Sequence, residues 1–251
     1  MPAFKFSANT GYLWRELPFL ERIQKTATHG FDGVEFHDEA QTCDRTALRN
    51  ALAETGLPVF SLNVRIGKTF GCAALPAARE QARRDIDQAI EVAEDVDAGA
   101  IHVLAGITSD ANAHQTYLEN LQYALDNFDR TILIEPVCAE QVPDYYLRTI
   151  ELAADILEEV GHPRLKIMFD CFHIHSESGD VRGQFANHSN KIGHVQISAV
   201  EGRAEPFPGI LDYSLLLPEF QKLGYFGPFG CEYRPANGTE NGLSWMESLR
   251  L

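Results

Sequence analysis

Polar residues whose types suit metal and proton chemistry stand at the ends of successive apolar segments. They are Glu135 in "ILIEP", Asp170 in "KIMFD", Gln196 in "HVQIS" and Glu232 in "GCEYRP". Carboxylates brought together in a low-dielectric site repel one another, which raises their pKa values or destabilises the fold. A divalent cation relieves that repulsion, and an all-oxygen set suits Mg²⁺ or Mn²⁺ better than zinc. The pattern predicts a shared metal site, provided that the fold brings these segments together.

Each of these residues also has a less specific interpretation. A single glutamate at a strand end is often a solvated rim residue, and a histidine inside a strand, such as His194, is more often a hydrogen-bonded core residue than a ligand. His194 lies two residues before Gln196 and therefore on the same face of a strand. His173 follows Asp170 by three residues. The coincidence of four polar ends on consecutive segments favours one common site.

Short apolar segments alternate with amphipathic ones along the whole chain. The segments expected to be strands are 4–8, 33–37, 59–64, 100–105, 131–135, 165–170, 194–198 and 229–233. The segments expected to be helical are 17–30, 44–56, 74–99, 114–128, 145–161, 179–193, 212–224 and 242–251. Near-continuous apolar strands that alternate with helices are typical of a parallel sheet covered by helices.

Eight such units in 251 residues most simply form an α/β fold, the (β/α)₈ TIM barrel, as a single domain over residues 1–251. A doubly wound open sheet is the alternative, but the first turn, "SANTGYLW", lacks its glycine-rich fingerprint. Active sites of TIM barrels lie at the carboxyl ends of the strands. The barrel thus supplies the proximity that the proposed metal site requires.

Composition restricts the partners. The net charge of −15 opposes nucleic acid binding, and no apolar stretch is long enough to span a membrane. Five scattered cysteines without a CxxC pair, and no evident signal peptide, predict reduced thiols and a cytoplasmic protein. Cys171 and Cys231 adjoin ligand candidates, and strand alternation points them away, between barrel and helices. Association into a homo-oligomer is left open.

One short motif is similar to part of a nucleotide-binding site, but the residues before it do not match. "IGKT", residues 66–69, resembles the end of a phosphate-binding loop. That loop needs a glycine five residues before Gly67, where this chain has Leu62.

The segments "GFDGVEF", "ILIEP", "FDCFHIHSESGDV", "IGHVQIS", "EGRAEP" and "GCEYRP" together resemble the hydroxypyruvate isomerase family. That family is xylose-isomerase-like in fold, alongside ketose 3-epimerases and abasic-site endonucleases. The resemblance implies that Glu135, Asp170, Gln196 and Glu232 hold the metal, and that Glu135 and Glu232 are the catalytic acid/base pair. His173 and Arg203 would contact the substrate, and His194 is a further candidate for substrate binding.

The implied chemistry is isomerisation of a small hydroxy-carbonyl, sugar-acid-like substrate in carbohydrate metabolism. Removing a proton beside a carbonyl group gives an enediolate, which a divalent metal stabilises, and two carboxyl groups move the proton. The same residues suit a 2-oxo-tetronate isomerase, a ketose 3-epimerase or a metal-dependent lyase or decarboxylase. Gln196 resembles hydroxypyruvate isomerases, since the epimerases usually have histidine there.

Two segments depart from the family pattern. "KTFGC", residues 68–72, lacks the usual Glu-Arg pair, and Ala204 and residues 207–210 replace a histidine and a polar loop. These changes predict a more apolar pocket rim and leave the identity of the substrate open. Arg65, Lys68, Arg203 and Arg234 are the cations considered for a substrate carboxylate. An endonuclease is disfavoured, because Gln196 stands where a zinc-binding histidine is needed.

Overall fold

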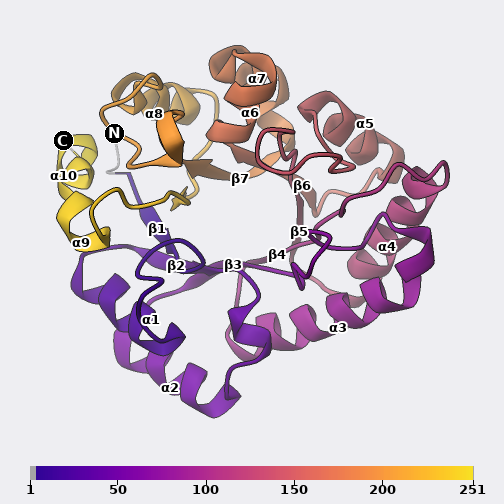
Figure 1. Cartoon of the computed structure of the whole chain (residues 1–251), viewed down its shortest axis with the longest axis horizontal. Coiled ribbons are helices and arrows are strands. Elements are labelled where there is room, and N and C mark those ends of the chain that lie inside the picture. Colours follow the sequence, from indigo (N-terminus) through magenta and orange to yellow (C-terminus); the bar gives the residue numbers. More distant parts are fainter. Residues whose placement is uncertain (1–3, 251) are drawn as a thin grey trace.

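The computed structural model describes residues 4–250, and its strands form one closed parallel barrel in sequence order (Figure 1). The strands are β1 (Phe6–Asn9), β2 (Gly33–Phe36), β3 (Val59–Asn63), β4 (Ala100–His102), β5 (Thr131–Ile134), β6 (Leu165–Asp170), β7 (Ile192–Ile197) and β8 (Phe229–Cys231). β1 pairs with both β2 and β8, which closes the ring. The predicted TIM barrel is confirmed.

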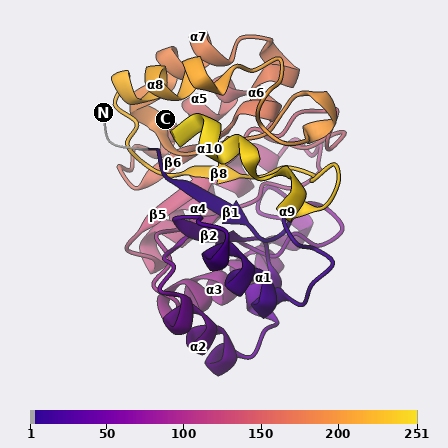
Figure 2. The same ribbon diagram turned by 90° about the vertical axis from the view of Figure 1, so that its left-hand side faces the viewer.

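The helices surround the barrel. They are α1 (Phe19–Thr28), α2 (Arg45–Thr55), α3 (Arg79–Asp95), α4 (Ala113–Asn127), α5 (Ile150–Val160), α6 (Cys171–Ser178), α7 (Val181–His188), α8 (Tyr213–Lys222), α9 (Thr239–Gly242) and α10 (Ser244–Arg250). α9 and α10 complete the ring between α8 and α1 (Figure 1). Figure 2 shows α7 and α8 on one side of the strands and α1 to α3 on the opposite side.

Local sequence explains where several helices begin and end. The Asp44 and Thr149 side chains accept hydrogen bonds from the amides of Ala47 and Leu152, so each satisfies an otherwise free N–H group of the first turn. Gly56 and Gly161 end α2 and α5 in the left-handed conformation that glycine adopts at little cost. These are glycines at which the sequence pattern predicts that a helix ends.

The structure differs from the predicted elements after β5 and β6. Residues 145–149 are not helical, so α5 begins later than predicted, at Ile150. α6 follows β6 directly and was not predicted, because "CFHIHSES" has no clear apolar periodicity. The Asp170 carboxylate caps α6 by accepting a hydrogen bond from the Phe172 amide at 2.8 Å. The helix predicted over residues 242–251 corresponds to α10, Ser244–Arg250. Residue 251 lies outside the residues that the structure describes.

The core between the barrel and its helices is apolar and aromatic. Phe169 of β6 contacts Phe185 of α7 edge-on, and Phe185 stacks on Phe220 of α8 with ring centroids 3.9 Å apart. Cys171 and Cys231 are fully buried in the same core, in the direction that strand alternation predicts. Burying such side chains stabilises the fold by about 1.5–3 kcal/mol each, which holds the strand ends in fixed positions.

Candidate active site

The barrel brings the predicted polar residues to one end of its interior, the mouth, where the carboxyl ends of the strands meet. Glu135 directly follows β5, Asp170 ends β6, Gln196 lies near the end of β7, and Glu232 directly follows β8. All four side chains are buried. β7 aligns Gln196 with Asp170 on one side and with Gly230 on the other.

Glu135, Asp170 and His173 form the tightest group of metal-ligand atoms. One ligand atom from each lies within 4.8 Å of the others. His173 Nε2 is 3.8 Å from Glu135 Oε1 and 3.7 Å from Asp170 Oδ2. Sequence reasoning placed His173 against the substrate, whereas the structure places it among the candidate ligands.

Arg203 separates Glu232 from that group. Its Nη2 atom lies 2.5 Å from Asp170 Oδ2 and 3.4 Å from Glu232 Oε1. The guanidinium group also stacks between the rings of Tyr12 and Phe172, at 5.0 and 5.1 Å. Arg203 is 2% exposed and has a positive φ of 54°, an unusual backbone conformation for this residue type. Buried cations with strained backbones are typical of functional sites.

The three carboxyl groups differ in acidity. Burial and the charges of Glu232 and Asp170 raise the pKa of Glu135 well above its ordinary value. Burial also raises the pKa of Asp170, to about 6, although Arg203 opposes the shift. For Glu232 burial acts in the same direction, but Arg203 and the His37 hydrogen bond outweigh it and lower the pKa to about 2. In the metal-free site these directions favour the neutral form of Glu135 and the ionised form of Glu232.

A second layer of polar residues lies deeper in the barrel, around Glu35 of β2. Gln196 Nε2 donates to Glu35 Oε2 at 3.1 Å, the Ser7 hydroxyl donates to Glu35 Oε1, and His194 Nε2 lies 3.0 Å from Oε1. The Glu35 carboxylate therefore faces the amino end of the Gln196 amide. The Oε1 atom of Gln196 therefore points away from Glu35. His194 lies in this deeper layer, so substrate contact by His194 stays a prediction.

Two buried oxygen atoms test whether the site fits a metal. Glu135 Oε1 and Gln196 Oε1 have no hydrogen-bond partner among the described residues. Leaving such a buried polar atom unpaired costs about 1–3 kcal/mol, so its retention needs an explanation. Oxygen atoms with free lone pairs beside carboxylates are the donors that Mg²⁺ and Mn²⁺ prefer. The residues present fit a divalent cation.

Sequence reasoning missed four residues of the site: Tyr12, Glu35, His37 and His102. His37 Nε2 lies 3.3 Å from Glu232 Oε1, and His102 Nε2 lies 3.8 Å from Glu135 Oε2. Burial lowers the pKa of His102 to about 3, so this histidine is neutral. Both histidines stand at strand ends, in "GVEFH" and "AIH". Inspection of the ends of β2 and β4, and not only those of β5 to β8, would have found them.

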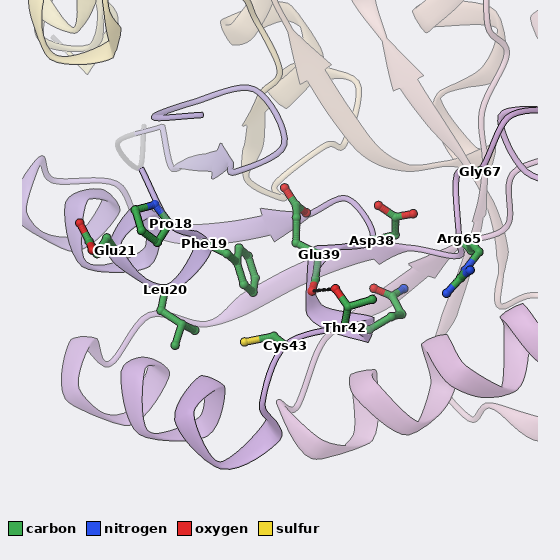
Figure 3. Close-up of a pocket in the computed structure, with 11 residues that line it drawn as sticks. Pro18, Phe19, Leu20, Glu21, Asp38, Glu39, Thr42, Cys43, Arg65 and Gly67 are labelled. Carbon is green, nitrogen blue, oxygen red and sulfur yellow. Dashed lines mark hydrogen bonds between the residues drawn. The ribbon is translucent and has the colours of Figure 1, made fainter. Parts of the chain in front are cut away.

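One residue of the segments that depart from the family pattern, Ile210, is 63% exposed and lines a groove with residues of α7 and α8. The more apolar pocket rim stays a prediction. A larger cleft, of about 790 Å³, lies between the start of α1 and the loops after β2 and β3 (Figure 3). Phe19, Asp38 and Arg65 line it, and none of the predicted ligands does. None of the predicted ligands therefore faces this cleft.

Comparisons with known proteins agree with this geometry. The family model described as a xylose isomerase-like TIM barrel matches residues 23–249. The 2-oxo-tetronate isomerase of Cupriavidus necator is 37% identical, with 97% of each chain covered. The hydroxypyruvate isomerase of Escherichia coli K12 is 34% identical, over 98% of this chain and 99% of that protein.

Solved structures show the same likeness. One described as a family 2 AP endonuclease from Brucella melitensis has a TM-score of 0.94 at 31% identity over the whole of both chains. The 3-keto-D-glucoside 4-epimerase of E. coli, at 19% identity and a TM-score of 0.79, shares the fold. Among the described residues, no helix is long and apolar enough to cross a membrane.

Proposed function

The chain belongs to the xylose isomerase-like TIM barrel family, and we propose that it is a metal-dependent isomerase of short 2-oxo acids that carry a hydroxyl group on the neighbouring carbon. Its relatives named 2-oxo-tetronate isomerase and hydroxypyruvate isomerase support an isomerase of small hydroxy-carbonyl compounds, of the hydroxypyruvate isomerase type. Hydroxypyruvate and 2-oxo-tetronates, named in the relatives, share this chemistry. We propose either as the substrate, and the cytoplasm as the site of action.

The observation that carries the metal assignment is the pair of unpartnered buried oxygen atoms, Glu135 Oε1 and Gln196 Oε1, beside Asp170. We assign Glu135, Asp170, Gln196 and Glu232 as the residues that hold Mg²⁺ or Mn²⁺. When bound, such a cation polarises the substrate carbonyl group and offsets the negative charge that develops on the substrate oxygens.

The two glutamates supply the proton transfer. Glu232, ionised at neutral pH, takes the proton from the hydroxyl-bearing carbon, and the electrons of that C–H bond form the enediolate. Glu135, the second member of the pair, delivers a proton to the adjacent carbon, the proton of the substrate hydroxyl passes to the former carbonyl oxygen, and the carbonyl group reforms one position along. Exchange with solvent restores the starting protonation states, so deuterium from D₂O enters the product.

Other residues orient the groups that react. Arg203 lies against Asp170 and Glu232 and keeps Glu232 ionised. His37 lies 3.3 Å from the same carboxylate and supports that state. His173 stands between Glu135 and Asp170, where it is positioned to contact a substrate oxygen. These roles of Arg203 and His173 extend the substrate-binding assignment that the resemblance implies.

The test is a proton-exchange screen in D₂O, followed by NMR. The Mn²⁺-loaded protein would be incubated with hydroxypyruvate, tartronate semialdehyde, 2-oxo-tetronates and four- to six-carbon ketoses, with EDTA-treated protein as the control. We expect metal-dependent deuterium uptake and isomer formation with a 2-oxo acid. Carbon dioxide release without an isomer would instead indicate a decarboxylase, and uptake without metal would contradict the metal assignment.

A further inference from the structure

We propose that Arg234 binds the substrate carboxylate and thereby selects 2-oxo acids over neutral sugars of the same length. The inference rests on the proposed function and assigns the part of the substrate that does not react. The three arginines that the sequence suggests for this role, Arg65, Arg203 and Arg234, have different surroundings in the structure. Those differences single out Arg234.

Arg203 is already committed to other partners. Its Nη2 atom faces both Asp170 and Glu232, and its Nε atom donates to the main-chain oxygen of Glu232 at 3.3 Å. Tyr12 and Phe172 cover the two faces of the guanidinium group. A substrate carboxylate would have to displace one of these buried carboxylates to pair with Arg203. Arg203 therefore serves the catalytic carboxyl groups.

The main chain of Arg234 is fixed at the mouth, while its guanidinium group keeps N–H donors available for a ligand. Its amide donates to the main-chain oxygen of Arg203 at 2.7 Å, which ties the end of β8 to the 3₁₀ helix η4 (Glu201–Arg203). Arg234 stands two residues after Glu232, just beyond the strand end that carries the catalytic carboxylate. The main chain of Arg234 is thus held beside Glu232 and Arg203.

The Arg234 side chain extends from β8 toward the loop after β5. Its Nη2 atom donates to Gln141 Oε1 at 3.3 Å, and Gln141 lies in the loop whose Cys138 amide contacts His173 Nδ1. The charge of Arg234 is also close enough to Tyr12 to lower the pKa of that hydroxyl, against the burial that raises it. The hydrogen bond to Gln141 thus directs the side chain toward the loop that contacts His173.

Arg234 is exposed and has a single neutral side-chain partner among the described residues. A planar guanidinium group with free N–H donors binds a carboxylate through two parallel hydrogen bonds. By contrast, Arg65 lines the separate cleft of Figure 3 and lies 3.9 Å from Asp85. Arg234 is therefore a guanidinium group at the mouth that an incoming carboxylate meets without breaking an ion pair among the described residues.

The experiment compares acids with neutral compounds of equal length. Deuterium exchange by the Mn²⁺-loaded enzyme would be measured with a 2-oxo-tetronate and erythrulose, and with hydroxypyruvate and dihydroxyacetone. The variants are Arg234→Gln and Arg234→Lys. Arg182→Gln is the matched control, since Arg182 is an exposed arginine on α7 that pairs with Glu219.

We expect Arg234→Gln to raise KM for the acids by about ten- to a hundred-fold, the range for a lost hydrogen-bonded charge pair, with kcat little changed. Exchange with the neutral compounds should change less than three-fold. The KM of Arg234→Lys for the acids should lie between those of wild type and Arg234→Gln, because lysine keeps the charge and loses the two parallel hydrogen bonds. Equal losses with acids and neutral compounds, or an unchanged KM for the acids, would overturn the proposal.

A binding measurement separates this inference from the proposed function. D-glycerate and glycerol would be titrated into EDTA-treated wild-type and Arg234→Gln protein and followed by NMR. We expect glycerate to bind wild type at least ten times more tightly than the variant, whether or not the protein turns over any compound tested. Equal glycerate affinity in the two proteins would refute the role of Arg234 independently of catalysis.

Discussion

At the scale of single residues, Arg203 determines how the carboxyl groups differ. It is buried beside Asp170 and Glu232 and forms ion pairs with both, whereas for Glu135 burial and the neighbouring carboxyl charges outweigh the effect of Arg203. An opposite charge at short distance favours ionisation, and burial among like charges opposes it. The position of Arg203 thus contributes to opposite pKa shifts of the two glutamates, as the proposed acid/base roles require.

Replacing either glutamate should separate activity from folding. Glu135→Gln and Glu232→Gln should each lower proton exchange by about 10²- to 10⁴-fold, the usual range for a lost acid or base. The measurement is deuterium uptake in D₂O by NMR, with circular dichroism as the control for folding. Wild-type turnover by either variant would show that its glutamate is not part of the acid/base pair.

Glu135→Gln should also stabilise the metal-free protein. The pKa of Glu135 is raised in the folded state, so the charged form costs stability above its unfolded pKa near 4.5. The neutral amide avoids that cost, and the melting temperature in EDTA should rise by roughly 2–4 °C per kcal/mol relieved. The gain should grow as pH increases from about 4.5. A gain that is independent of pH would mean that the effect is not electrostatic.

Glu35 is expected to act through Gln196. A carboxylate accepts hydrogen bonds from the amide NH₂ group only, so Glu35 fixes which end of Gln196 faces the metal site. Glu35→Gln removes this preference and should weaken Mn²⁺ binding by about 10- to 100-fold, as for other residues that orient metal ligands. Titration followed by electron paramagnetic resonance measures the affinity, and Gln196→Ala gives the effect of losing the ligand itself. Unchanged Mn²⁺ affinity would argue against this orientation.

At the scale of elements, β8 must lack a side chain where it passes the Glu35 layer. A Cβ atom at Gly230 would lie 2.4 Å from Glu35 Oε1 and 2.8 Å from His194 Nε2. The glycine thus makes space for a polar layer inside the barrel. This requirement explains the glycine in the middle of β8, two residues before Glu232.

Gly230→Ala should therefore destabilise the protein by about 1–3 kcal/mol, the usual cost of overpacking, and lower its melting temperature by roughly 2–4 °C per kcal/mol. Gly209→Ala is the control, because the nearest atom to its Cβ would be 3.4 Å away. Thermal unfolding measures both. If the two variants melted at the same temperature, the Glu35 layer would have to be more loosely packed than the structure shows.

At the scale of the whole molecule, the metal and the fold should depend on each other. The carboxyl groups lie on separate strands, and a bound cation joins them in the folded state alone. Mn²⁺ at a hundred times its dissociation constant should stabilise the fold by about 2.7 kcal/mol.

The closed barrel also supports our proposal that residues 1–251 form a single domain.

This stabilisation should decrease at low pH. Ligands must be deprotonated to bind a cation, and the pKa of Asp170 is raised to about 6 in the metal-free protein. Protonation competes with the metal as pH falls through about 6. We expect the difference in melting temperature with and without Mn²⁺ to shrink between pH 7.5 and pH 5. A constant difference would exclude Asp170 as a ligand.

The sequence by itself determined the strand order, the barrel and the candidate ligands, because apolar periodicity and polar strand ends are local features. The segments "ILIEP" and "GCEYRP" indicate Glu135 and Glu232 as candidate site residues without any information on the neighbouring strands. Only the tertiary structure decided how those groups differ. Arg203 comes from a loop with no periodic pattern, and Glu35 and His37 approach across the seam where β1 closes on β8. Acidity depends on distances of a few ångströms between groups far apart in sequence, so it emerges when the barrel closes.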